Sequence, residues 1–295
     1  MTPSEPIERI SADAADAIAS LGDRRRLEIL VALAAAERSE GTAGTSLSFS
    51  TLYDATDVES SSQFAYHLDQ LVGPFVERTP DGYRLTYTGG RIARAVRAGL
   101  YEPATSFDDE PVGGTCIRCG SASLVATVAD EGFHIHCRAC EETLLSDIFP
   151  RSQARGRTAA EIVESFGHRI WGSLVQLRAG VCPECAGRVE TSVTTTELGG
   201  RTLYTHASTC PECWFGFALP VEAVAVFHPA AANRLWMAGI DLWDVPLWEL
   251  FEFIVSDSIT TDVSSRDPLG LRFEVALEGD RLELEMDESG SVTVA

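Results

Sequence analysis

Lysine is absent from the 295-residue chain, so all 23 of its basic side chains are arginines. Aspartate and glutamate number 44, which gives a formal net charge of −21. We expect such a surface in a salt-adapted cytoplasm, where dense carboxylates stay hydrated and salt screens their mutual repulsion. The alternative is an ordinary acidic protein, and the complete lack of lysine argues against it.

Long apolar runs are also absent. No uninterrupted apolar stretch reaches the ~18 residues that a transmembrane helix needs, so we expect no membrane partner. Met1 is followed by Thr-Pro-Ser-Glu-Pro, without the basic start and apolar core of a signal peptide. We therefore expect a cytoplasmic protein.

Familiar catalytic motifs are missing as well. The chain has no glycine-rich phosphate loop, no nucleophile elbow and no H-E-x-x-H pattern. Scattered acidic residues are too common in this composition to indicate acid–base chemistry. We therefore do not expect an enzyme.

What the chain does contain is cysteine in a regular pattern. All eight cysteines fall into four C-x-x-C pairs: Cys116/Cys119, Cys137/Cys140, Cys182/Cys185 and Cys210/Cys213. Hairpins are readable between the pairs, with strands expected at Leu124–Val128 and Phe133–Ile135, and at Val189–Thr196 and Arg201–Thr205. Two C-x-x-C turns joined by a hairpin close a tetrahedral site of four thiolates, which is the pattern of a zinc ribbon.

The sequence thus predicts two structural Zn²⁺ ions per chain. One is bound by Cys116, Cys119, Cys137 and Cys140, the other by Cys182, Cys185, Cys210 and Cys213. Disulfides are disfavoured in a cytoplasm, a redox dithiol needs only one pair, and an iron–sulfur cluster fits ribbon hairpins less well. Four sulfur ligands leave no position for water, so the ions should not be catalytic. Nearby His134, His136 and His206 are expected to be ordinary strand residues.

A second pattern occupies Leu47–Leu85. Ser60 is a good N-cap for a helix whose Phe64, Leu68 and Leu71 recur at buried helical spacing. A shorter helix precedes it, and two strands about Pro80-Asp81-Gly82 follow it. The order helix, turn, helix, hairpin predicts a winged helix-turn-helix that binds double-stranded DNA.

The opposite, polar face of this helix and the hairpin supply the DNA-binding candidates: Ser60, Ser61, Ser62, Gln63, Tyr66, His67, Arg78 and Arg84. The alternative is a solvated helix face. Residues 1–105 hold 15 acidic residues and 10 arginines, which is less acidic than the remainder but not basic, and this weakens the electrostatic signature of a DNA-binding domain. At molar salt the Debye length is only ~3 Å, so contact hydrogen bonds would decide binding.

Three segments carry a family resemblance: LGDRRRLEILVAL (Leu21–Leu33), AYHLDQLV (Ala65–Val72) and GYRLTYTGGRIARAV (Gly82–Val96). They resemble the ArsR-type winged-helix regulators. The whole chain resembles a haloarchaeal group that joins such a domain to a cysteine-rich C-terminal region. The resemblance implies a transcriptional regulator that forms a homodimer through its last helix. This domain lacks cysteine, and Arg91–Tyr101 lacks Asp and His, so the metal-sensing sites of that family are not expected here.

Further helices are expected in this first domain. Their ranges are Ala12–Ser20, Arg24–Glu37, Ser50–Thr56 and, starting at Thr86 or Thr88, a last helix to Leu100. The predicted buried residues are Leu27, Leu30, Val31 and Ala34 in the second of these helices, and Leu52 and Ala55 in the third. Ala95, Ala98 and Gly99 form a small-residue face on the last helix, suited to pairing with a second copy.

Amino-acid composition and the spacing of apolar residues predict the structure of the rest of the chain. Residues 1–9 are expected to be a loose tail, and residues 103–114 a linker. A capping box after Thr158 opens a long helix with apolar residues at Ile162, Val163, Phe166, Ile170, Leu174 and Leu177. Short helices at Ala230–Gly239 and Pro246–Ser256 carry Trp236 and Trp248, with Trp243 between them; these are expected in a core, and a ligand pocket is the alternative. Leu271–Leu277 and Leu282–Met286 alternate as antiparallel strands about Glu278-Gly279-Asp280.

Together these patterns predict an α+β protein. Its parts are a winged helix-turn-helix domain (1–102), a linker (103–114), two zinc ribbons with an intervening helix (115–220), and C-terminal helices and antiparallel strands (221–295). The function expected is a DNA-binding regulator whose C-terminal part senses a small-molecule effector or binds a protein. The alternatives are a protein like a basal transcription initiation factor, and a metal- or thiol-dependent enzyme in the C-terminal half.

Overall fold

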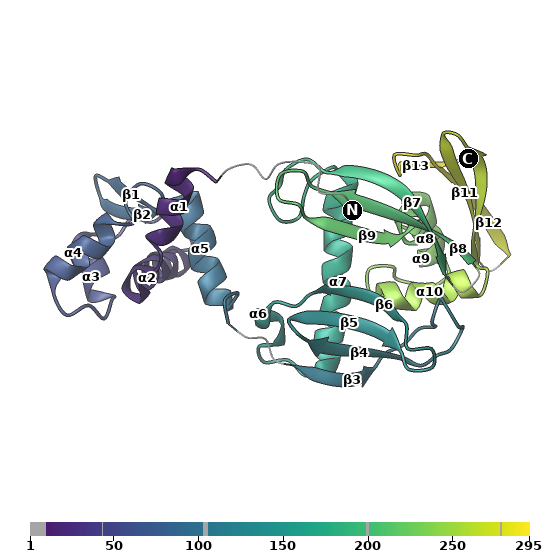
Figure 1. Ribbon diagram of the computed structural model, residues 1–295, viewed down its shortest axis with the longest axis horizontal. Helices are drawn as coiled ribbons and strands as arrows, with labels where there is room; N and C mark the ends of the chain where they lie inside the picture. The colour runs from purple at the N-terminus through teal and green to yellow at the C-terminus, as the bar shows by residue number, and fades with distance from the viewer. Residues whose placement is uncertain (1–9, 43, 103–105, 199–200, 278) are drawn as a thin grey trace. The chain divides into compact units, whose positions relative to one another are not determined.

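The computed structural model describes residues 10–42, 44–102, 106–198, 201–277 and 279–295 (Figure 1). The expected tail at 1–9, the start of the linker at 103–105, the Gly199-Gly200 turn and Glu278 lie outside these residues. Helices and antiparallel sheets alternate along the chain, which confirms the α+β class. The chain divides into two units, one of Met1–Pro103 with Pro150–Ser152 and one of Ala104–Phe149 with Gln153–Ala295. The first division falls beside the expected domain boundary at 102.

The first unit contains helices, each opened by a capping side chain, and one hairpin. The elements are α1 (Ala12–Ala19), α2 (Arg24–Glu40), α3 (Phe49–Asp54), α4 (Ser61–Asp69), β1 (Val76–Thr79), β2 (Gly82–Leu85) and α5 (Tyr87–Ala98). The N-cap oxygens of Ser11, Asp23, Ser48, Ser60 and Thr86 each accept a backbone N–H from the first turn of their helix. These caps fix the starts of the helices within one residue of the predicted positions; α3, for example, was expected from Ser50 and begins at Phe49.

The core of this unit forms where α2, α3 and α4 meet. Phe64, Leu68 and Leu71 of the predicted stripe are all buried, and the rings of Phe49 and Tyr53 contact Phe64 edge-on, with ring centroids 5.0 and 5.4 Å away. Leu52 is fully buried as expected.

The predicted buried face of α2 is partly wrong. Ile29, Leu30 and Leu33 are buried, whereas Leu27, Val31 and Ala34 are only half-buried. Apolar residues surround this helix on most sides, so periodicity alone does not select the face that packs against the other helices. Ala55 is exposed as the C-cap of α3, and its predicted burial is also wrong.

The β1–β2 hairpin has a two-residue loop, Pro80-Asp81, because Thr79 pairs with Gly82. Gly82, predicted in the turn, is therefore the first residue of β2. Its φ is 132°, and a Cβ at this position would lie 2.1 Å from the Leu47 carbonyl oxygen. Only glycine lets the segment before α3 approach the hairpin and exchange backbone hydrogen bonds with Tyr83.

The second unit is built on three antiparallel sheets. The first contains β3 (Phe107–Pro111), β4 (Leu124–Ala129), β5 (Gly132–Cys137) and β6 (Thr143–Ile148); the second β7 (Glu190–Leu198), β8 (Arg201–Thr209) and β9 (Gly216–Pro220); the third β10 (Ile259–Arg266), β11 (Leu269–Leu277), β12 (Asp280–Met286) and β13 (Val292–Val294). Strand β3 lies inside the predicted linker, so that expectation is wrong for Phe107–Pro111. Strands β6, β9, β10 and β13 were not predicted either.

Helix α7 (Ala159–Arg178) connects the first sheet to the second along the chain, and its ribbon crosses strands of both in the view of Figure 1. It opens with the predicted capping box of Thr158 and Glu161. Its apolar stripe is buried except for half-buried Val163. Phe166 stacks on Phe133 of β5, with ring centroids 3.9 Å apart, and so fixes the first sheet against the helix.

Four short helices complete the unit: α6 (Arg151–Ala154), which starts in the first unit, α8 (Val221–Val226), α9 (Pro229–Met237) and α10 (Leu247–Val255). Trp248 is fully buried, but Trp236 and Trp243 are 61 % and 52 % exposed. The three tryptophans therefore do not share one core or pocket. Among the described residues, no helix is long and apolar enough to cross a membrane.

Phe64 gives a test of the first unit's core. Phe64→Ala should lower the free energy of unfolding by ~3–5 kcal/mol, because the ring is fully buried and leaves a cavity. Tyr66→Ala on the same helix is the control, since Tyr66 is 60 % exposed, and it should cost less than ~1 kcal/mol. Denaturant titration of both variants measures the difference; equal losses would contradict this packing.

Candidate functional site

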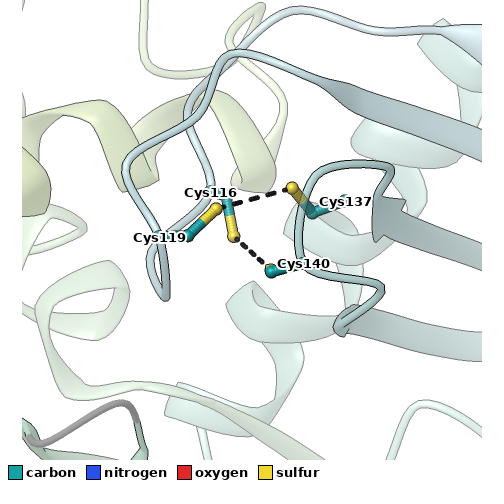
Figure 2. A group of neighbouring side chains, drawn as sticks. All are labelled: Cys116, Cys119, Cys137 and Cys140. Carbon is teal, nitrogen blue, oxygen red and sulfur yellow. Dashed lines mark hydrogen bonds between the residues drawn. The ribbon is translucent and has the colours of Figure 1, made fainter.

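The first cysteine group lies at one end of the β4–β5 hairpin. Cys116 and Cys119 come from the loop before β4, Cys137 ends β5, and Cys140 lies in the turn before β6 (Figure 2). The sulfurs of Cys116 and Cys140 are 3.7 Å apart, as are those of Cys119 and Cys137. Each pair of cysteines thus faces the other pair across a small gap.

The second group repeats this arrangement at the end of the β7–β8 hairpin. The sulfurs of Cys182 and Cys213 are 3.6 Å apart, as are those of Cys185 and Cys210. Within each group, all four sulfurs lie within 4.8 Å of one another. A tetrahedron with metal–sulfur bonds of about 2.3 Å has sulfur–sulfur edges of about 3.8 Å. The two tetra-cysteine groups are therefore compatible with two structural metal ions.

All four C-x-x-C turns have the same backbone hydrogen bonds. With the first cysteine of each turn as residue i, its N–H donates to the carbonyl of residue i+5. The N–H of residue i+4 donates to the carbonyl of residue i. Each of these hydrogen bonds is 2.8 or 2.9 Å long. The residue after each second cysteine has a left-handed φ: 71° for Gly120 and 60° for Glu141, Ala186 and Trp214. A non-glycine residue there costs ~1–2 kcal/mol, so three of the four turns are held against local strain.

Burial and backbone donors act differently on the sulfurs of these groups. Burial raises the pKa of the Cys116 thiol to about 12. Burial also raises the pKa of Cys182, but backbone N–H groups of Cys185 and Glu184 donate to its sulfur, and the net pKa is about 7. Four thiolates so close together repel one another, and a bound cation removes that repulsion.

The nearby histidines lie outside both groups, as expected. Nδ1 of His134 is 2.9 Å from Oγ of Ser146, and Nε2 of His136 is 3.7 Å from the Asp109 carboxylate. His206 is buried on β8. Among the described residues, the two tetra-cysteine groups are the clusters with metal-ligating geometry.

The polar candidates of the first unit gather on α4. Ser61, Ser62, Gln63 and Tyr66 are exposed on its first two turns. Oγ of Ser60 accepts the Gln63 N–H at 3.3 Å, so the Ser60 side chain is used as the helix cap. This face presents hydroxyl, amide and phenol groups to solvent.

Three of the predicted DNA-binding residues are placed differently from the expectation. His67 is only 8 % exposed, with Nδ1 3.9 Å from the Asp23 carboxylate, so its inclusion on the exposed face is wrong. It lies three residues after buried Phe64, on the same side of the helix, and turns inward with it.

The two hairpin arginines are paired within the unit. Nη2 of Arg78 is 2.9 Å from Oδ1 of Asp69, and Nη2 of Arg84 is 2.7 Å from Oε2 of Glu77. Sequence reasoning missed both pairs, although the facing of Glu77 and Arg84 follows from the hairpin register.

Two family profiles cover most of the described chain. Residues 113–292 match a domain of unknown function, DUF7351, and residues 14–96 match another, DUF7347. The chain belongs to the DUF7351 family. No curated protein and no solved structure matched the chain. The DUF7351 region holds both cysteine groups and α7, and the DUF7347 region holds the capped helices and hairpin of the first unit.

Metal content tests the cysteine groups of this DUF7351 protein. Protein purified without added metal should contain about two equivalents, one for each closed all-thiolate site. Cys119→Ser and Cys185→Ser should each remove about one equivalent and lower the melting temperature, because metal binding and folding are coupled. Ser121→Ala, a small polar change beside the first group, is the control. No bound metal in the parent protein would contradict the assignment.

The residue with left-handed φ after the second cysteine of each turn gives a matched pair of variants. Gly120→Ala should destabilise the first group by ~1 kcal/mol, because φ is positive there and alanine is strained. Ala186→Gly, at the equivalent position of the second group, should relieve that strain and not destabilise the protein. Thermal unfolding of the metal-loaded variants measures whether each substitution raises or lowers stability. A stabilising Gly120→Ala would refute the shared turn geometry.

Proposed function

We propose that this protein is a DNA-binding transcription regulator of the ArsR-like winged helix-turn-helix type, with two C-terminal zinc ribbons. The observation that carries the proposal is the exposed Ser61–Gln63 and Tyr66 face of α4, which follows α3 and precedes the β1–β2 hairpin. In this assignment α4 is the recognition helix and the hairpin is the wing.

Gln63 is the residue proposed to read a base. It lies in the first turn of α4, where side chains of a recognition helix reach base edges in the major groove, and its amide can pair with N6 and N7 of adenine. Ser61, Ser62 and Tyr66 have the hydroxyls for phosphate contacts on either side.

The wing arginines take a more limited part. Arg84 is paired with Glu77 and Arg78 with Asp69, so each phosphate contact requires an exchange of partners. Exposed pairs of this kind are worth only ~0–1 kcal/mol, which makes the exchange feasible. The arginines would add affinity without sequence information.

Zinc is the metal proposed for both groups. Hairpins closed by two C-x-x-C turns with four sulfurs are the pattern of structural zinc, and a closed site leaves no position for catalytic water. A structural role for both ions also argues against the metal-dependent enzyme considered above.

A homodimer is proposed for the first unit. Helix α1 buries none of its residues, and Ile18 is 68 % exposed. Tyr87, the first residue of α5, is 79 % exposed, and Tyr101, which follows the end of that helix, is 69 % exposed. Such an apolar surface supports pairing with a second copy. The expected small-residue face is less accessible, because Ala95 and Ala98 are half-buried and Gly99 is buried.

Selection of bound DNA from a random pool in molar KCl tests the proposal. The selected site should be pseudo-palindromic, with half-sites about one helical turn apart, if a two-fold dimer binds. Gln63→Ala should then relax preference at one position per half-site by roughly 1–3 kcal/mol. Gln176→Ala, an exposed glutamine of the second unit, is the matched control.

Two further variants distinguish sequence-specific contacts with bases from electrostatic attraction to the DNA backbone. Arg84→Ala should weaken binding to selected and scrambled DNA alike, and Glu77→Gln should strengthen both because it frees Arg84. Titrations at fixed salt measure these effects. If no sequence is enriched, or if Gln63→Ala and Tyr66→Ala bind as the parent does, α4 is not a recognition helix.

A further inference from the structure

A cavity of about 260 Å³ lies in the second unit. No cysteine lines it, although its lining residues Leu177 and Val189 pack with Cys182 and Cys210. It forms where the end of α7 and strands β7 and β8 meet the loop between β12 and β13. Its polar lining comes from Arg178, Thr191, His206, Ser289, Gly290 and Ser291. No acidic residue of the described chain lines it, although acidic residues outnumber arginines 44 to 23 in the sequence.

Arg178 supplies the positive charge of this cavity. It is the last residue of α7, and its Nη1 donates a hydrogen bond to the carbonyl of Phe227. The residue as a whole is exposed, and the partial burial of its guanidinium lowers the pKa of that group. Among the described residues, the guanidinium forms no ion pair with a carboxylate. An arginine without a carboxylate partner, at the edge of a cavity without acidic side chains, favours an anion, because it can form a charge-assisted hydrogen bond with it.

His206 faces the same cavity from β8. It is 7 % exposed, and burial lowers the pKa of its ring, while a hydrogen bond with its own backbone acts in the opposite direction. The backbone of Gly290 lies against this ring: a Cβ there would be 2.4 Å from its Cδ2 and Nε2. Glycine at this position keeps the loop in contact with the imidazole.

Three carboxylates are close to this lining in sequence. Glu190 and Glu288 are exposed and do not line the cavity, and Asp287 is already used inside its own loop. Its Oδ1 accepts hydrogen bonds from the Ser289 N–H at 2.9 Å, the Ser289 hydroxyl at 2.6 Å and the Ser291 N–H at 3.0 Å. Thr191 Oγ1 donates to the Ser289 carbonyl at 2.7 Å and ties the loop to β7. Asp287 therefore organises the wall of the cavity and does not neutralise Arg178.

We propose that this cavity binds a small anion, a carboxylate or phosphate group held by Arg178 and His206. Its volume is below the ~300–1,000 Å³ of pockets for drug-sized ligands, so the ligand has few heavy atoms or inserts only its anionic end. Bound there, it links α7, the second hairpin and the C-terminal sheet. The site goes beyond the proposed DNA binding and does not depend on it.

Calorimetric titration of the full chain tests the site, with inorganic phosphate and malonate as separate probes in molar KCl. At least one probe should bind saturably at about one per chain. Arg178→Gln should weaken that binding about tenfold or more, since it removes a charge-assisted contact. Arg272→Gln is the matched control: it removes the same charge from an exposed pair with Glu285 on the third sheet and should bind as the parent does.

His206→Phe is the second variant, because it keeps the ring volume and removes the N–H; it should also weaken binding. Metal content and thermal unfolding show that each variant is folded, and if Arg178→Gln does not fold, His206→Phe decides. Binding of phosphate alone assigns a phosphate ligand, and binding of malonate alone assigns a carboxylate. Absence of saturable binding by both probes, or undiminished binding in the folded variants, would overturn the proposal.

Discussion

The fold of the second unit depends on its two cysteine groups, in each of which four sulfur atoms come together around one point. In the first group this joins turns at Cys116 and Cys137 that the β4–β5 hairpin brings together, since Leu124 pairs with Cys137. In the second, the last pair of the β7–β8 hairpin, Glu190 with Thr209, directly precedes Cys210. Each hairpin therefore ends at its cysteine turns. A cation that binds all four sulfurs compensates the left-handed strain at Glu141, Ala186 and Trp214.

Helix α7 connects the ends of these hairpins to the core of the unit. Phe133 of the first hairpin stacks on Phe166, and one turn further Trp171 donates its Nε1 hydrogen to the Val245 carbonyl at 2.8 Å while its ring contacts Phe227. Arg178 ends the same helix beside the cavity. The first hairpin and the proposed anion site thus share one rigid element. Packing along this helix gives a physical route by which a ligand at one end would stabilise the sheet at the other.

Local and strong signals in the sequence were enough to predict much of this fold. The C-x-x-C pairs gave both cysteine groups, the capping box at Thr158 gave the start of α7, and the i, i+4, i+7 stripe from Phe64 gave the buried face of α4. What failed depends on tertiary packing. The FDDEP segment becomes edge strand β3 despite its linker-like composition, because only pairing with β4 decides it. His67 is buried because it meets the start of α2, a contact that no helical period contains. The cavity of Arg178 and His206 joins residues from segments far apart in the chain.

The excess of acidic residues is the strongest constraint on how the proposed DNA complex could form. Both wing arginines already have carboxylate partners, so a phosphate would replace a carboxylate and release few counterions on balance. Affinity would then fall only weakly with rising salt, unlike the steep dependence of a basic DNA-binding domain. At molar salt, where charges beyond ~3 Å are screened, the repulsion between phosphates and the carboxylates of this unit also fades. Under those conditions, hydrogen bonds from Gln63 and Tyr66 would carry recognition in the proposed complex, and the negative charge of the unit would not prevent specific binding.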